Sequence, residues 1–316
     1  MKVLLLYSPS TEHRAALERA APHATWVVAE SQAEAAEAIV DAEVVLGNHW
    51  FLESLDRARK LRWMQTPSMG VDWVLEGAEA LRDVVVTCAR GVYDDEVAEH
   101  ATALLLALAR GLHRSRDEQR REAWNRAPLR TVAGMKALVL GQGGVGRGIG
   151  RRLTALGARP EGVRRVHQGP PAIGAEGYPV HGPATWRERL PEMDAVVLAL
   201  PLTAETRRLV GAAEVARLPR RAFVVNVGRG GTLDEAALLE SLRTDALAGA
   251  ALDVFESEPL PPGHPAWSEG RLLLTPHVAR SPETGPRRFE PLFVENVRRF
   301  AAGEPLLHVV DRGAGY

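Results

Sequence analysis

The sequence has few of the features that mark secreted and membrane proteins. It contains one cysteine, Cys88, which excludes a disulfide framework within the chain. Cys88 stands in the apolar run VVVTC, so we expect a buried small hydrophobic residue. No run of about 18 apolar residues occurs. The apolar run at the start, in MKVLLLYSPS, is too short for a secretion signal or a membrane span. We therefore expect a cytoplasmic protein.

The chain also lacks an excess of charge of either sign. Its 39 basic and 40 acidic residues leave a net charge of -1, so no electrostatic attraction to nucleic acid or to an anionic membrane is expected. The apolar fraction of 46% and the charged fraction of 25% are ordinary for a globular protein. A length of 316 residues suggests two domains.

Short apolar runs alternate with helical patterns along most of the chain. The expected strands are 2–8, 25–30, 43–48, 62–66 and 83–88, then 136–141, 162–166, 194–201, 222–228, 248–255 and 271–277. Between them, apolar residues recur every three or four positions, as they do in helices, at 12–21, 32–42, 51–60 and about 144–156. This alternation predicts the α/β class, with doubly wound parallel sheets that are covered on both faces.

Three further segments complete the expected organisation. Residues 94–124 form the longest helical pattern, and its stretch ATALLLALA is apolar nearly all round, which predicts burial, for example between two domains. Residues 167–185 are rich in glycine and proline and are typical of a surface loop. The last helical pattern, 291–303, could fold back onto either domain.

The stretch VLGQGGVGRGIG is the clearest motif for a cofactor. Gly141, Gly143 and Gly146 form a G-x-G-x-x-G pattern between an apolar strand and a helix, which is the context of a dinucleotide-binding loop. Gly141 would permit the tight turn, Gly143 the approach of a pyrophosphate, and Gly146 close helix–strand packing. The helix then begins with Gly144 and Val145, whose N–H groups would face the phosphates. The alternative is a plain glycine-rich turn.

The end of the following strand carries two arginines. A Rossmann fold normally places an acid there for the ribose 2′-hydroxyl, but this chain has Arg164 and Arg165. Guanidinium groups attract a 2′-phosphate and can bind it bidentately. The pattern therefore favours NADP(H) as the cofactor, with NAD(H) as the alternative. Both arginines could instead be solvated loop residues.

Three residues that suit keto-acid reduction follow separate strands of the second series. Arg229 in NVGRGG could bind a carboxylate, His277 in TPH could donate a proton, and Glu258 in EPLP could hold the imidazole protonated. The carboxyl ends of parallel strands share one sheet edge, so these side chains can converge there. Taken singly, each could be a turn residue, a loop histidine or a solvated acid.

Motifs along nearly the whole chain resemble those of the D-isomer-specific 2-hydroxyacid dehydrogenases. In that family, the arginine of VGRGG, the glutamate of EPLP and the histidine of TPH form the catalytic set, which implies these roles for Arg229, Glu258 and His277. The matching segments are TPSMGVDWV, VAEHATALLLALAR, VLGQGGVG, LPLTAETRRLV, FVVNVGRGGTLDEAALLESL, LAGAALDVFESEPLP and LLTPHVA.

The resemblance also implies further binding residues. Asp253 matches a family residue that holds the nicotinamide carboxamide, and the cofactor contacts of the family fall on Pro201, Thr206 and Val227. The stretch SMGVD would bind the substrate carboxylate through Met69, Gly70 and Val71, although the family usually has a small residue where Met69 stands. His49 and Trp50 lie on a loop that shapes side-chain specificity in relatives; Trp50 could equally be a packed surface aromatic residue.

The resemblance implies two Rossmann-like or flavodoxin-like domains with a cleft between them. The substrate-binding domain would comprise residues 1–96 and 284–316, the dinucleotide-binding domain residues 97–283, and the 97–120 helix region would form a homodimer. The expected activity is the reduction of a small 2-keto acid, such as glyoxylate or hydroxypyruvate, to the D-2-hydroxy acid, with no metal. The alternatives are a corepressor-like protein that senses dinucleotides and a dehydrogenase of another substrate, such as phosphite.

Overall fold

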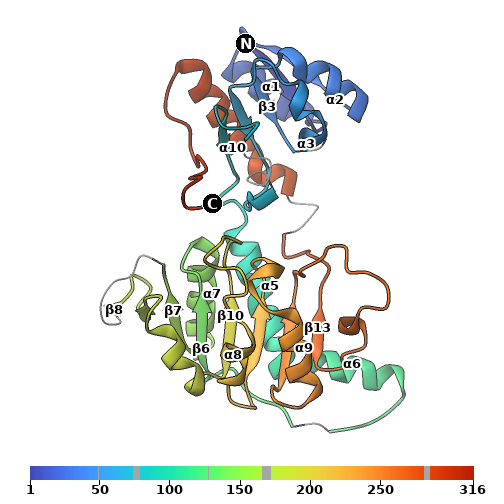
Figure 1. The fold of residues 1–316 in the computed structure, drawn as a ribbon, viewed down its shortest axis with the longest axis vertical. Helices are drawn as coiled ribbons and strands as arrows, with labels where there is room; N and C mark the ends of the chain where they lie inside the picture. Colours follow the sequence, from blue (N-terminus) through green and yellow to red (C-terminus); the bar gives the residue numbers. More distant parts are fainter. Residues whose placement is uncertain (49, 74–78, 127, 166–171, 281–284) are drawn as a thin grey trace. The chain divides into compact units, whose positions relative to one another are not determined.

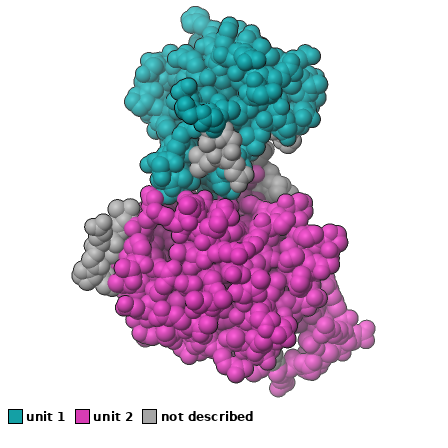
Figure 2. Space-filling view, viewed as in Figure 1, with its two compact units in different colours: residues 1–93, 282–316 teal, residues 94–281 magenta. Residues whose placement is uncertain are grey.

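The computed structural model describes the whole chain except residues 49, 74–78, 127, 166–171 and 281–284. Two compact units make up the chain: unit 1 is Met1–Tyr93 with Pro282–Tyr316, and unit 2 is Asp94–Ser281 (Figure 2). Each unit contains its own β-sheet, which is parallel throughout in unit 1 and parallel except for one pair in unit 2. The α/β class expected from the alternating pattern is therefore what the chain adopts. No helix among the described residues is long and apolar enough to cross a membrane.

Unit 1 is built on a five-stranded sheet with the order β2-β1-β3-β4-β5. Its strands are β1 (Lys2–Leu5), β2 (Thr25–Val28), β3 (Val44–Leu46), β4 (Trp63–Gln65) and β5 (Val85–Thr87), and all neighbours pair in parallel. The helices whose bounds the structure describes are α1 (Thr11–Ala20), α2 (Gln32–Ala38), α3 (Phe51–Ser54) and α10 (Gly285–Ala302), with the short 3-10 helices η1 (Ile39–Asp41) and η2 (Leu55–Arg57).

The C-terminal helix α10 belongs to unit 1. It packs against α1, and its Phe293 and Val297 share one buried cluster with Val3 and Leu5 of β1 (Figure 1). The sequence alone left the choice between the two domains open, because an amphipathic pattern shows that a helix has an apolar face but not which surface will bury it.

Unit 2 is built on an eight-stranded sheet with the order β13-β12-β11-β10-β6-β7-β9-β8. All pairs are parallel except β8 with β9. The strands are β6 (Lys136–Leu140), β7 (Arg159–Val163), β8 (Ala172–Ile173), β9 (Pro179–His181), β10 (Ala195–Leu198), β11 (Phe223–Asn226), β12 (Gly249–Leu252) and β13 (Leu272–Leu274).

Helices cover both faces of this second sheet (Figure 1). On one face, α5 (Asp94–Ala109) packs against α7 (Gly144–Ala155) and against β11 and β12. On the other lie α8 (Ala212–Ala216) and α9 (Glu235–Arg243), which pack together. The remaining helical segments are α6 (Leu112–Arg120), η3 (Trp186–Glu192), η4 (Gly230–Thr232) and η5 (Pro265–Trp267). The apolar stretch of α5 is thus buried within unit 2.

Three expectations about the elements were wrong. The helical pattern 94–124 forms two helices, because Gly111 adopts a left-handed conformation (φ +61°) and separates α5 from α6. The strand expected at 162–166 is β7, which ends at Val163. The supposed loop 167–185 contains β8 and β9, whose register buries Val180 at the sheet edge. The glycine and proline residues around these short strands are typical of loops, so the sequence did not indicate the strands.

Candidate active site

The glycine loop after β6 has the backbone geometry of a dinucleotide-binding loop. Gly141 adopts a positive φ of +100°, and a Cβ there would lie 2.5 Å from the carbonyl oxygen of Ala199. A Cβ at Gly146 would overlap the carbonyl oxygen of Gly141. By contrast, a Cβ at Gly143, the residue before α7, would meet nothing within 4 Å. The space in front of Gly143 and the first N–H groups of α7 therefore fit a diphosphate.

A carboxylate that the sequence did not single out lies beside this loop. The Oδ2 atom of Asp94 occupies the space that a side chain at Gly144 would need. Gly144 is consequently required for close approach to α5, in addition to its place in the first turn of α7 with Val145. The expected functions of Gly144 and Val145 concern their backbone N–H groups.

Arg164 and Arg165 follow the carboxyl end of β7 directly and are exposed. The backbone N–H of Arg164 donates to the carbonyl of His181, and the guanidinium of Arg165 lies 3.9 Å from Glu205. The acid inside β7, Glu161, accepts hydrogen bonds from Arg189 and contacts His181 at 2.7 Å. Burial favours a higher pKa for Glu161, but these partners outweigh it and hold the pKa below its ordinary value. The carboxylate of Glu161 is therefore ionised and already paired with Arg189 and His181.

The loop that follows β10 is fixed by its own hydrogen bonds. The hydroxyl of Thr206 donates to the carbonyl of Pro201 at 2.7 Å and accepts from the backbone N–H of Thr203 at 2.8 Å. Val227, after β11, is 7% exposed, and its N–H donates to Leu198. Pro201, Thr206 and Val227 therefore stand at the carboxyl edge of the same sheet as the glycine loop.

The glycines around Arg229 serve close backbone packing. A Cβ at Gly228 would lie 2.6 Å from the carbonyl oxygen of Leu200, and one at Gly230 would overlap the backbone of Phe255. The following helix, α9, already has a carboxylate at its N-terminus, because Asp234 accepts from the N–H of Ala237. NVGRGG is therefore no second phosphate loop.

The backbone carbonyl of Arg229 is held by two side chains. It accepts from the amide of Asn226 at 3.0 Å and from the hydroxyl of Thr232 at 2.7 Å. The guanidinium donates to the carbonyl of Gly228 at 2.9 Å. Asn226 is the last residue of β11 and is fully buried, so the position of Arg229 is tied to the end of that strand.

His277 and Glu258 form a close pair. The imidazole Nδ1 lies 2.6 Å from Oε2 of Glu258, and the other carboxylate oxygen accepts from the N–H of Phe255 at 2.9 Å. The hydrogen bond to Glu258 raises the pKa of His277 above its ordinary value, against the opposing effects of burial and of Arg229. Burial works against ionisation of Glu258, but the hydrogen bonds from His277 and Phe255 keep its pKa below the ordinary value. The pair thus favours an imidazolium beside a carboxylate.

Asp253 holds the loop that carries His277. It is 1% exposed, follows β12, and accepts hydrogen bonds from the hydroxyl of Thr275 at 2.7 Å and from the N–H groups of Val278 at 3.0 Å and Ala279 at 3.1 Å. Its backbone carbonyl accepts from the N–H of His277 at 2.8 Å. His277 adopts a positive φ of +53°, a conformation that costs about 1–2 kcal/mol for a residue with a side chain.

The residues expected to bind the substrate carboxylate lie in unit 1. Met69 and Gly70 are half-buried in the segment after β4, and Val71 is buried. Trp50, at the start of α3, is half-buried against the core of unit 1 and adopts a positive φ of +52°. His49 lies outside the described residues. Arg229, Glu258 and His277 all lie in unit 2.

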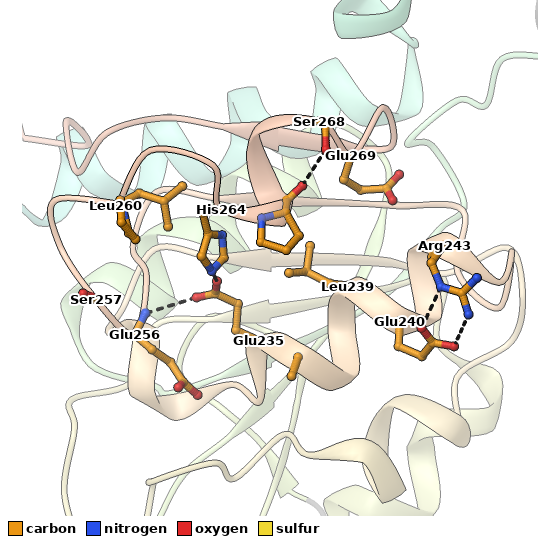
Figure 3. A pocket seen from close by; sticks show the side chains of 13 residues that line it. Glu235, Leu239, Glu240, Arg243, Glu256, Ser257, Leu260, His264, Ser268 and Glu269 are labelled. Atoms are coloured by element: carbon orange, nitrogen blue, oxygen red, sulfur yellow. Dashed lines mark hydrogen bonds and ion pairs between the residues drawn. The ribbon is translucent and has the colours of Figure 1, made fainter.

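A pocket of about 690 Å³ lies on unit 2 between α9 and the segment from Glu256 to Glu269 (Figure 3). Figure 3 shows Glu235 directed toward His264, and these side chains are 3.1 Å apart. The wall contains the carboxylates of Glu235, Glu240, Glu256 and Glu269 and a single arginine, Arg243. Because this lining repels phosphate, the pocket is a poor site for a dinucleotide.

The comparisons with known proteins decide the family. Residues 102–279 match the family model described as "D-isomer specific 2-hydroxyacid dehydrogenase, NAD binding domain". The chain belongs to this family. Its members are NAD(P)-dependent oxidoreductases, and the resemblance seen in the motifs is thereby confirmed.

Family members of known structure share the fold over the whole chain. A family protein from Aeromonas salmonicida is 32% identical, with a TM-score of 0.87, and the match covers 98% of this chain and 99% of the other. An NADPH-dependent glyoxylate/hydroxypyruvate reductase from Sinorhizobium meliloti, in complex with NADP and sulfate, is 28% identical, with a TM-score of 0.85 over 100% of this chain and 99% of that one. A glyoxylate reductase from Korarchaeum cryptofilum is 32% identical over 80% of this chain and 76% of its own length.

One residue in a family motif makes a contact that the sequence did not suggest. His100 lies in VAEHATALLLALAR, which suggested a buried helix and a match to the family but no role for the histidine. The structure places its Nε2 atom 3.1 Å from the hydroxyl of Thr275 and 3.3 Å from Oδ1 of Asp253. A histidine directly before the apolar stretch of this helix was the one available signal. No group of metal-binding side chains occurs among the residues that the structure describes.

Proposed function

We propose that the protein reduces a small 2-keto acid, such as glyoxylate or hydroxypyruvate, to the D-2-hydroxy acid with NADPH. The observation that carries the proposal is the pair of His277 and Glu258, 2.6 Å apart, at the carboxyl edge of the sheet that also bears the glycine loop. An imidazolium kept protonated by a carboxylate is suited to protonate a carbonyl oxygen. The substrate names of the relatives support the same class of substrate.

Each residue of the set has a separate task in this proposal. When bound, the nicotinamide supplies the hydride that is added to C2 of the substrate. His277 gives its proton to the carbonyl oxygen, and Glu258 stabilises the charged ring beforehand. Arg229 binds the substrate carboxylate and polarises the carbonyl. We assign Gly70, Val71 and Met69 of unit 1 to the carboxylate as well, and Trp50 to side-chain selection, as the resemblance implies.

We assign the cofactor to unit 2. Gly141, Gly143, Gly144, Val145 and Gly146 would hold the diphosphate through the free N–H groups of α7. Pro201, Thr206 and Val227 would contact the adenosine and nicotinamide halves, and Asp253 the carboxamide, in addition to its support of the histidine loop. NADP(H) is preferred in this proposal, because Arg164 and Arg165 are exposed at the end of β7 while Glu161 is held by Arg189 and His181.

A panel of 2-keto acids assayed with NADPH and with NADH tests this function. We expect turnover of glyoxylate or hydroxypyruvate, followed as loss of nicotinamide absorbance, with a lower KM for NADPH than for NADH. Phosphite with NADP⁺ or NAD⁺ is the arm for the alternative dehydrogenase. Binding of NADPH without turnover of any substrate in the panel would contradict the proposal and favour a dinucleotide sensor.

We also propose that the protein is a homodimer formed through α6. This helix and the segment after it project from unit 2 (Figures 1 and 2), and they expose Leu112, Leu129 and Trp124, the last to 91%. A second chain could cover this apolar surface. Most of the apolar residues of α5 are buried within unit 2, so within the expected region 97–120 we propose the part that contains α6 as the interface.

A further inference from the structure

His100 reaches the loop of His277 from a distant part of the chain. It lies on α5, and its side chain is 22% exposed. Its Nε2 atom is 3.1 Å from the hydroxyl oxygen of Thr275 and 3.3 Å from Oδ1 of Asp253, across 175 positions in the sequence from Thr275. Thr275 and Asp253 are the two residues that fix the start of the histidine loop.

The direction of these contacts follows from counting protons. A threonine hydroxyl has a single hydrogen, and that of Thr275 is donated to Asp253 at 2.7 Å. The carboxylate of Asp253 can only accept. His100 must therefore carry a proton on Nε2 and donate it toward both oxygen atoms. This N–H completes a set of four donors around Asp253, with the hydroxyl of Thr275 and the N–H groups of Val278 and Ala279.

The histidine loop needs this support. His277 adopts a left-handed backbone conformation, which a residue with a side chain rarely keeps unless its surroundings impose it. The hydrogen bonds from the loop to Asp253 impose it here, and each depends on the carboxylate staying in one orientation. A donor from α5 ties that carboxylate to a helix that is packed on the sheet of unit 2.

We infer that His100 is a positioning residue, which keeps His277 beside Glu258 by donating from Nε2 to Thr275 and Asp253. The inference rests on the proposed role of His277 for its meaning in catalysis, but the contact itself can be tested without turnover. Glutamine carries an N–H donor at a similar distance from the backbone and can replace the imidazole N–H, whereas leucine cannot.

Modification of His277 by diethyl pyrocarbonate tests the contact directly. Trypsin releases residues 272–280 as the peptide LLLTPHVAR, in which His277 is the single histidine, so mass spectrometry can follow its labelling. In His100→Leu we expect His277 to leave Glu258 and to react about fivefold faster, the factor that corresponds to one lost hydrogen bond. His100→Gln should react as the unmodified protein does. Glu99→Leu, an exposed change on the same helix, is the matched control.

Kinetics separate positioning from general packing. His100→Leu should lower kcat by a similar factor and change both KM values by less than about twofold, and His100→Gln should restore kcat. Equal losses in His100→Leu and His100→Gln, or labelling of His100→Leu at the rate of Glu99→Leu, would overturn the inference. If His100→Leu does not fold, His100→Asn against His100→Gln decides, because the shorter amide of asparagine cannot bring an N–H donor to Thr275 and Asp253. Absence of keto-acid turnover in the unmodified protein would sink the proposed function alone, since the labelling rates still test His100.

Discussion

At the scale of single residues, the charge state of His277 depends on Glu258. In the proposed reaction the imidazolium is the proton donor, so reduction is supported below the pKa of His277 and is lost as pH rises through it. The hydrogen bond to Glu258 raises this pKa above the ordinary value of 6.5 and so extends activity to higher pH. In Glu258→Gln we expect the alkaline limb of the kcat profile to move to lower pH, and kcat to fall by about tenfold or more.

Glu256→Gln is the control for that change. Glu256 precedes Glu258 by two residues, but its carboxylate pairs with Arg208 at 3.3 Å. We expect this variant to keep the pH profile of the unmodified protein. An alkaline limb that stays in place in Glu258→Gln would show that another group donates the proton.

The arginines after β7 give a second prediction at this scale. Replacing both Arg164 and Arg165 with serine should raise the KM for NADPH about tenfold or more, because charge-assisted hydrogen bonds to the 2′-phosphate are lost. The KM for NADH, which has no 2′-phosphate, should change little. Initial-rate measurements with both cofactors would check this, and an equal rise in both KM values would remove the arginines as the basis of cofactor choice.

Residue types in motifs were readable from the sequence, whereas contacts between distant residues were not. Arg229, Glu258 and His277 could be proposed because each follows a predicted strand in a recognisable motif. The left-handed backbone of His277 and the donors around Asp253 could not, since they depend on how β12 and the segment after β13 face each other. His100 was missed for the same reason: its partners lie more than 150 positions away.

At the scale of elements, the glycines at the start of α7 differ in what they are needed for. A Cβ at Gly146 would overlap the carbonyl of Gly141, so Gly146→Ala should destabilise unit 2 by about 1–3 kcal/mol. A Cβ at Gly143 would meet no atom within 4 Å, so Gly143→Ala should cost less than about 1 kcal/mol. Denaturant unfolding monitored by circular dichroism would give both values.

The affinity for NADPH should depend strongly on Gly143, even though the stability of unit 2 should depend on it only weakly. Gly143→Ala places a methyl group where the diphosphate is proposed to approach, so its affinity for NADPH should fall although the fold is intact. Titration of NADPH fluorescence measures this. If Gly143→Ala binds NADPH as tightly as the unmodified protein, the diphosphate does not approach the chain at Gly143.

Most elements were predictable because apolar periodicity reports burial directly. The strands β6, β10, β11, β12 and β13 lie within the expected runs, since both faces of the central strands are covered. Prediction failed toward the β8 end of the sheet. There, β7 begins and ends about three residues before the expected strand, and β8 and β9 are too short to show an apolar periodicity. The break at Gly111 also went unpredicted, because a single glycine inside a helical pattern is often tolerated.

At the scale of the whole molecule, the sequence predicted two domains with parallel sheets. It could not show which surface of one chain would contact a second chain. Trp124 is 91% exposed beside α6, and a tryptophan at the centre of an interface commonly contributes about 2 kcal/mol or more. Trp124→Ala should therefore weaken the proposed dimer about thirtyfold, which light scattering after size-exclusion chromatography would detect as a shift toward the mass of one chain. Trp267→Ala, at a tryptophan that is 56% exposed elsewhere on unit 2, should leave the mass unchanged. A single-chain mass for the unmodified protein, or equal effects of both substitutions, would exclude α6 as the interface.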